Sequence, residues 1–224
     1  LIKGDEETEG LKAPFIPNNH QINFIENLHY RNIILKARQL GFTTMIAIYY
    51  LDCCLFGEGN VRAGMIAQDK NAAESLFRDK VKFAYDNLPP EIKERFPLAR
   101  DSASELLFAH NNSSIKVGTS MRSGTLQYLH VSEFGKICAK FPDKAKEVLT
   151  GSIPAVSPSG IIVIESTAEG EAGAFYEMSE IARKNKESNK ELSKKNYKFH
   201  FYPWLGATEY ALDPSGIVIA EKEP

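Results

Sequence analysis

The stretch "IILKARQLGFTT", residues 33–44, joins an apolar run to a helical pattern through a glycine turn. The run at 32–37 has the length and unbroken hydrophobicity of a strand that is buried on both faces. Residues 43–56 are apolar nearly throughout and end before Gly57 and Gly59, which predicts a core helix. A strand, a glycine turn and a helix in this order are typical of a phosphate-binding loop.

The loop departs from the standard pattern G-x-x-x-x-G-K-[ST] at its cation. When the second glycine is aligned with Gly41, Thr43 takes the hydroxyl position, but Phe42 takes the lysine position. Phosphate chemistry needs helix N–H groups, a hydroxyl for Mg²⁺ and a cation near the β and γ oxygens. We predict that Lys36 or Arg38 supplies this cation from upstream. The alternative is a basic strand end followed by a plain glycine turn.

Two later strands also end in polar residues. "LQYLHVSEF" (126–134) ends in Ser132 and Glu133, where an acidic pair commonly binds the metal and orients the attacking water. Serine in the first position weakens the hold on the metal, and we predict Glu133 to be the general base. "IIVIEST" (161–167) ends in Ser166 and Thr167, which we predict to lie beside the Glu133 strand and to sense the γ-phosphate. The alternatives are a glutamate that begins a surface loop and an ordinary strand end.

The rest of the chain alternates strand and helix patterns. Strands are predicted at 62–68 and 197–204, a hairpin at 105–120, and helices at 69–88, 142–150 and 173–185. This alternation predicts an α/β fold with a mainly parallel, doubly wound sheet, as in P-loop NTPases of the RecA/ASCE-like type. The lysine-rich segment 184–196 is interpreted as a loop or frayed helix end, or else as a DNA or partner contact.

Composition limits the classes of function. The 224 residues suit one large domain, and a net charge of −2 excludes a broadly basic surface, so any DNA contact is local or comes from elsewhere. The three cysteines lack metal-ligand spacing and are predicted to be buried free thiols of a reducing compartment. No apolar run approaches the length that spans a bilayer, which favours a cytoplasmic protein. No serine or cysteine has a recognisable nucleophile setting.

With these three strand ends in order, the chain resembles the ATPase domain of the large terminase subunit of tailed bacteriophages. "ARQLGFTT" is similar to that family's deviant Walker A motif, "LHVSE" to its Walker B motif, and "EST" followed by Ala168 to its coupling motif. The resemblance covers residues 14–205. Residues 1–13 are then a lead-in and 206–224 a connector or lid, and the nuclease domain of full-length terminases is not expected in this chain.

The resemblance implies a site for ATP and Mg²⁺. The implied nucleotide-binding residues are Gln21, Lys36, Ala37, Arg38, Gln39, Leu40, Gly41, Phe42, Thr43, Thr44, Ser166 and Thr167. Glu133, Arg38 and Arg122 are implied to be catalytic, and Thr43 and Ser132 to hold the metal. Gln21 would read adenine, unless it is only a helix cap. Arg122 would reach into a neighbouring subunit's site, where such a finger adds ~10³ or more in rate, unless it is a surface or salt-bridged arginine.

The implied function is Mg²⁺-dependent ATP hydrolysis that powers translocation of double-stranded viral DNA into a procapsid. The implied partners are the DNA, a portal protein, a small terminase subunit and copies of the chain in a ring of about five, with a monomer expected in isolation. The place of action is the host cytoplasm, transiently at the portal, and a lid near Trp204 would follow the nucleotide state. Two alternatives stay open: a helicase-like ATPase, and a nucleotide-binding assembly module with little turnover.

Overall fold

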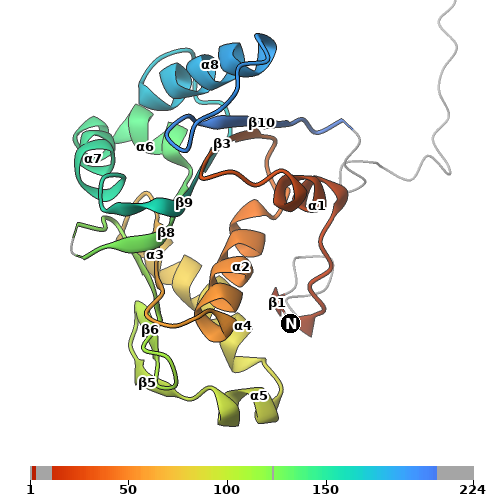
Figure 1. Ribbon diagram of the computed structural model, residues 1–224, viewed down its shortest axis with the longest axis vertical. Coiled ribbons are helices and arrows are strands. Elements are labelled where there is room, and N and C mark those ends of the chain that lie inside the picture. Colours follow the sequence, from red (N-terminus) through yellow and green to blue (C-terminus); the bar gives the residue numbers. More distant parts are fainter. Residues whose placement is uncertain (1, 4–11, 123, 206–224) are drawn as a thin grey trace, which may run out of the picture.

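An eight-stranded sheet forms the centre of the computed structural model, which describes residues 2–3, 12–122 and 124–205 (Figure 1). The strand order is β10-β3-β9-β8-β4-β7-β6-β5. The strands are β3 (Arg31–Lys36), β4 (Arg62–Ile66), β5 (Leu98–Asp101), β6 (Glu105–Phe108), β7 (Ser114–Gly118), β8 (Leu126–Ser132), β9 (Val156–Ser166) and β10 (Lys198–Tyr202). The six strands from β10 to β7 are parallel, and β6 and β5 add an antiparallel edge. The predicted mainly parallel α/β sheet is confirmed.

Helices cover both faces of the sheet, each over its own apolar core. One face packs against α1 (Asn19–Glu26), α2 (Phe42–Phe56) and the continuous helix of α3 (Lys70–Leu76), η1 (Phe77–Lys82) and α4 (Phe83–Asp86). The other face packs against α6 (Phe134–Lys140), α7 (Pro142–Glu147), η2 (Val148–Ser152) and α8 (Ala174–Glu187). Because helices cover both faces of the sheet, the central strands are buried on both sides, which agrees with their continuous apolar sequences.

Several short elements were not predicted. They are the two-stranded sheet of β1 (Ile2–Lys3) and β2 (Lys12–Ala13), α5 (Pro90–Arg95), β5 and α6. The helix α6 has only seven residues, too few for a clear apolar period, and β5 is a largely exposed edge strand. The lysine-rich segment remains helical to Glu187 and then forms a loop in which the Lys194 Nζ lies 4.6 Å from the centre of the Tyr30 ring. The predicted connector at 206–224 lies outside the described residues.

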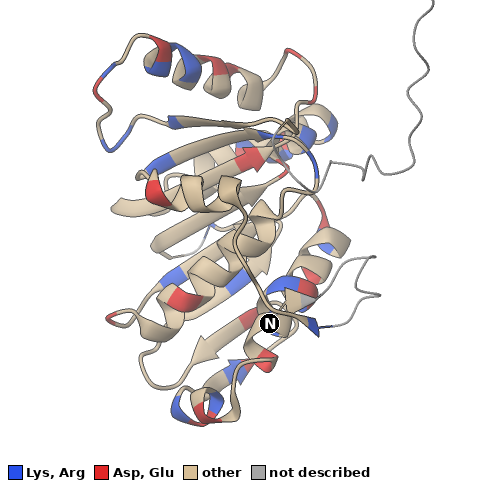
Figure 2. Cartoon of the chain, turned by 90° about the vertical axis from the view of Figure 1, so that its right-hand side faces the viewer, with Lys and Arg blue, Asp and Glu red and all other residues tan. Residues whose placement is uncertain are grey.

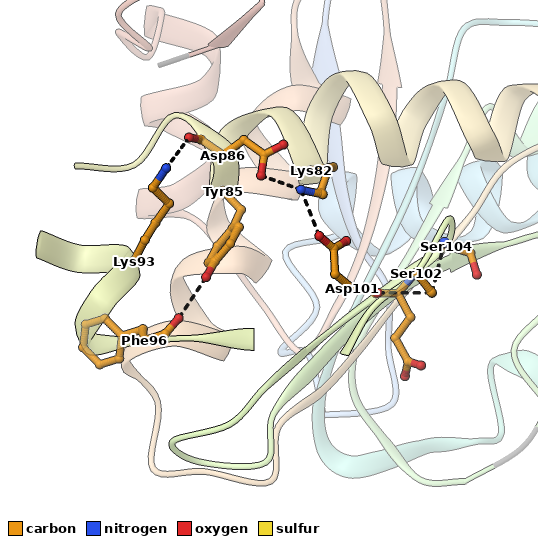
Figure 3. A network of polar contacts seen from close by, with 9 residues as sticks. Lys82, Tyr85, Asp86, Lys93, Phe96, Asp101, Ser102 and Ser104 are labelled. Atoms are coloured by element: carbon orange, nitrogen blue, oxygen red, sulfur yellow. Dashed lines mark hydrogen bonds and ion pairs between the residues drawn. The ribbon is translucent and has the colours of Figure 1, made fainter. Parts of the chain in front are cut away.

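Polar contacts join the end of η1 to β5 at the antiparallel edge of the sheet, and α4 to the residue that follows α5 (Figure 3). Lys82 pairs with Asp86 one helical turn away and, at 3.1 Å, with Asp101 of β5. The Tyr85 hydroxyl donates a hydrogen bond to the Phe96 carbonyl at 3.0 Å. These contacts hold the antiparallel edge rather than the strand ends that carry the predicted site.

The carboxyl ends of β3, β4, β8, β9 and β10 meet at one edge of the sheet because these strands are parallel. All three polar strand ends identified in the sequence therefore lie at this edge, which is where open α/β sheets bind ligands. Lysine and arginine are interspersed with aspartate and glutamate over the helices and loops on the side drawn in Figure 2. Within the described residues, no helix is long and apolar enough to cross a membrane.

Candidate functional site: a phosphate loop at the carboxyl edge of the sheet

The loop between β3 and α2 turns sharply through two residues in the left-handed region. Gln39 has φ of +56° and Gly41, the residue before α2, has φ of +67°. Glycine adopts this conformation without steric cost. The residue before α2 is Gly41, which has no side chain that could accept a hydrogen bond from the N–H groups of the first turn. The turn therefore presents a helix amino terminus that suits a phosphate.

The side-chain amide of Gln21 joins this turn to the start of α1. Its Nε2 donates to the Leu40 carbonyl at 3.0 Å, and its Oε1 accepts from the Asn18 N–H at 3.1 Å. Asn18 caps α1 and also reaches the Leu40 carbonyl, at 3.3 Å. A Cβ on Gly41 would lie 2.6 Å from the Gln21 Nε2 and would displace this amide, while the positive φ of Gly41 favours glycine. Gln21 thus has the helix-capping role weighed for it, and adenine reading stays a prediction.

Gln21→Ala is expected to lower the free energy of unfolding by about 1–3 kcal/mol, because it leaves buried backbone groups of the loop with fewer partners. Urea unfolding followed by circular dichroism measures this. Asn27→Ala, on the exposed end of the same helix, is the control and is expected to change stability by less than about 0.5 kcal/mol. Unchanged stability together with weaker ATP binding would contradict the support role and favour adenine reading.

Phe42 lies in the core and not in the phosphate site. Its side chain is 1% exposed, stacks on Tyr202 at 4.9 Å between ring centres and meets Phe24 edge-on at 5.9 Å. The side chain at the standard lysine position therefore points into apolar surroundings. Phe42 is therefore in the core, and a cation from Lys36 or Arg38 stays a prediction.

Lys36, the first cation candidate, is buried between two carboxylates. Its Nζ lies 3.1 Å from Glu165 Oε2 and 3.5 Å from Glu133 Oε1. Burial lowers the pKa of Lys36, but attraction to Glu165 and Glu133 outweighs burial and raises it. Lys36 is therefore a charged residue whose charge is already balanced within the site.

Arg38, the second candidate, is exposed and lines a hollow of about 190 Å³ beside the loop. The other residues that line it are Lys36, Gln39, Glu133, Lys136 and Thr167. Lys36 is already paired with carboxylates, so Arg38 and Lys136 are the two cations of this hollow that favour an anionic ligand. Lys136 was not predicted to be a site residue. It lies three residues after Glu133 in α6, a helix too short to show a helical pattern in the sequence.

A second hollow of about 470 Å³ adjoins the first and is lined by Thr43, Ser132, Glu133 and Lys136. Its other side is formed by residues after β4 and along α3 and η1, namely Ala67, Gln68, Ala72, Ser75, Leu76, Asp79 and Lys80. The structure thus brings together the predicted hydroxyl, the predicted metal-side serine and the predicted general base. They come from α2, β8 and the turn after β8.

Glu133 has a backbone conformation that is uncommon for a side chain with a Cβ. Its φ is +53° and its ψ +44°, in the left-handed region, directly between β8 and α6. Non-glycine residues held in this region are strained and concentrate at functional sites. The turn directs the half-buried carboxylate to both hollows, which suits the predicted role as general base.

Ser166, Thr44 and Arg122 are among the predicted residues that line neither hollow, as are Gln21, Ala37, Leu40, Gly41 and Phe42. Ser166 is fully buried, and its Oγ would be 2.8 Å from a Cβ on Gly135, so it faces α6 rather than the loop. Thr44 is also buried, inside the first turn of α2. Arg122 precedes the amino end of β8, whereas the site is at its carboxyl end, and its Nε pairs with Glu147 Oε1 at 2.7 Å. Any catalytic role of Arg122 therefore belongs to a neighbouring copy's site.

Glu165 is the central residue that sequence reasoning missed. Its carboxylate is fully buried, and Oε1 accepts hydrogen bonds from Thr43 Oγ1 at 2.8 Å and Ser132 Oγ at 2.9 Å. Burial raises the pKa of Glu165, but His130, Lys36 and Thr43 outweigh burial and hold the pKa at about 2, so the group is ionised at neutral pH. The available signal was a glutamate inside an otherwise apolar strand, which is costly unless the charge is paired.

Solved structures of large terminases are similar to this chain in fold. The HK97 bacteriophage large terminase matches 85% of this chain with a TM-score of 0.62 and 18% identity. A mutant of the Thermus phage P74-26 large terminase ATPase domain matches 91% of this chain and 86% of its own length, with a TM-score of 0.59 and 18% identity. The large terminase of the thermophilic bacteriophage D6E, in complex with ADP, matches 82% with a TM-score of 0.53 and 11% identity. The chain has the fold of the large terminase ATPase domain.

The similarity to these terminases is a similarity of fold, and in the HK97 and D6E proteins it covers only part of the chain. The chain spans 40% of the HK97 protein and 44% of the D6E protein. No protein-family model matches the sequence, and no curated protein matches it by sequence.

Proposed function

We propose that this chain is the Mg²⁺-dependent ATPase of a terminase large subunit and powers translocation of double-stranded DNA into a viral procapsid. The observation that carries the proposal is the meeting of Thr43, Ser132 and Glu133 in one hollow next to an uncapped helix amino terminus. Hydroxyl, carboxylate and helix N–H groups in this arrangement suit phosphoryl transfer. The fold supports the proposal, since the similar D6E terminase binds ADP.

The chain's own residues divide the chemistry between them. The first turn of α2 and the guanidinium of Arg38 bind the phosphates, and Lys136 lines the same hollow as Arg38. Glu133 orients a water for in-line attack on the γ-phosphate and accepts its proton. Thr167, at the end of the third strand, lies in the same hollow as Arg38 and reports the nucleotide state to the segment that follows.

The oxygen atoms of the site fit Mg²⁺. Thr43 and Ser132 present hydroxyls, and Glu165 adds a buried carboxylate whose Oε2 is paired with the Lys36 ammonium at 3.1 Å. Mg²⁺ prefers oxygen ligands and keeps several waters and phosphate oxygens. When bound, Mg²⁺ would neutralise charge on the β and γ oxygens.

The partners follow from this role. We propose that the chain works on a portal in a ring of about five copies, with a small terminase subunit that delivers the DNA. In isolation it is a monomer in the host cytoplasm. Arg122, 62% exposed at its side chain, reaches from one copy toward the site of the next.

The test of this function is the rate of ATP hydrolysis by the purified chain, measured at increasing protein concentration. Turnover per chain is expected to rise with concentration, and Arg122→Ala is expected to remove the rise, with a loss on the order of 10³ at high concentration. Arg100→Ala is the matched control, because Arg100 is equally exposed and equally paired, to Glu105. A turnover per chain that is independent of concentration and unchanged in Arg122→Ala would contradict the finger. ATP binding without turnover at any concentration would leave the nucleotide-binding assembly module.

A further inference from the structure

The strand that carries Glu165 lies directly beside the strand that carries Ser132. In the parallel pairing of β8 and β9, Ser132 is opposite Glu165. Alternation along β9 turns Glu165 to the same face as Val163, which is the face covered by α2, while Ser166 turns to α6. Lys36 of β3 emerges on this face too, two residues after Ile34, the partner of Glu165. A carboxylate therefore stands one strand away from the position at which phosphate-loop enzymes carry their metal-binding aspartate.

The contacts of Glu165 go beyond those needed to balance its charge. Lys36, 3.1 Å from Oε2, already serves as a counter-ion for the buried carboxylate. Oε1 faces a different set of groups: the hydroxyls of Thr43 and Ser132 and, at 3.4 Å, the ring of His130. The carboxylate thus lies within hydrogen-bonding distance of the hydroxyl that a phosphate loop gives to Mg²⁺.

We infer that Glu165 supplies to Mg²⁺ the carboxylate that position 132 lacks, and that it holds the ion together with Thr43. Ser132 orients this carboxylate through its hydroxyl and is not the principal metal ligand. The inference rests on the proposed function, since the ion arrives with the nucleotide. It explains how a serine at the end of β8 is compatible with metal binding, because the acidic group is provided by the adjacent strand.

The test measures how Mg²⁺ changes the affinity for a fluorescent ATP analogue, in Mg²⁺ and in EDTA. In the unaltered chain, Mg²⁺ is expected to raise the affinity for the nucleotide. In Glu165→Gln, we expect this increase to be about 10- to 100-fold smaller, while the affinity measured in EDTA changes little. The double variant Ser132→Asp with Glu165→Gln returns the carboxylate to β8 and is expected to restore most of the gain. Glu94→Gln, on the exposed surface of α5, is the control. Binding of Mn²⁺ with the nucleotide, read by electron paramagnetic resonance, provides a second readout independent of hydrolysis.

The outcomes separate this inference from the function it rests on. If Glu165→Gln keeps the full gain from Mg²⁺, the inference is wrong and the proposed function stands. If the unaltered chain binds no nucleotide in either condition, both are wrong. Glu165→Gln leaves Lys36 with Glu133 as its partner, which favours folding. If circular dichroism shows that Glu165→Gln does not fold, Glu165→Asp replaces it, because aspartate keeps the charge on a side chain that is one methylene shorter. If Mg²⁺ raises the nucleotide affinity of Glu165→Asp as much as that of the unaltered chain, the inference is wrong.

Discussion

Phe42→Lys, which restores the lysine of the standard phosphate loop, is expected to destabilise the chain by about 4 kcal/mol or more and not to activate it. Phe42 is 1% exposed and packs against Tyr202 and Phe24. Loss of a buried phenylalanine alone costs about 3–5 kcal/mol, and an ammonium among aromatic rings adds a desolvation cost. Since domains are stable by only about 5–15 kcal/mol, this change is expected to remove a large part of the free energy of unfolding.

Urea and thermal unfolding measure this effect. Phe42→Leu is the control, because it keeps an apolar side chain at the same position and is expected to lose less than Phe42→Lys. A Phe42→Lys variant that folds normally and binds ATP more tightly would mean that this side chain faces the phosphates. The account of a displaced cation would then be wrong.

Glu133→Gln is expected to lower the turnover of ATP by about 10²- to 10⁴-fold while nucleotide binding is retained. The amide keeps the shape of the side chain but cannot accept a proton from the attacking water. Lys36 retains Glu165 at 3.1 Å, so the loop keeps its support. Phosphate release at saturating MgATP measures turnover, and binding of the fluorescent analogue measures affinity.

The exposed residue Glu94 again provides the control, since Glu94→Gln removes a carboxylate far from the strand ends and is expected to leave turnover unchanged. Normal turnover in Glu133→Gln would exclude Glu133 as the general base, and the base would have to be sought among other groups of the hollow.

Local sequence was sufficient for the loop and the strand ends. An apolar run, a glycine turn and a helix predicted β3, the turn at Gly41 and α2, because each depends on neighbours in sequence. Thr43 and Glu133 could also be placed, since parallel strands bring their carboxyl ends to one edge. The predicted layers followed from alternating strands and helices.

The charge pairing inside the site could not be predicted from sequence. Lys36 meets Glu133 and Glu165, which are 97 and 129 residues away in the chain, and only the strand order brings them together. Glu165 was missed because it lies in an apolar strand pattern, and its partners Thr43, Ser132 and Lys36 belong to other elements. Gln21 was interpreted by analogy as an adenine contact, while its amide donates to the Leu40 carbonyl of the loop and accepts from the Asn18 N–H that precedes α1.

The most direct measurement is a calorimetric titration of MgATP into the unaltered chain. The central claim is that a phosphate loop without its lysine still binds a nucleoside triphosphate at the carboxyl edge of the sheet. We expect saturable binding of one nucleotide per chain that ADP displaces and that Arg38→Ala weakens. The absence of saturable binding at millimolar MgATP, in a chain shown by circular dichroism to be folded, would contradict the claim.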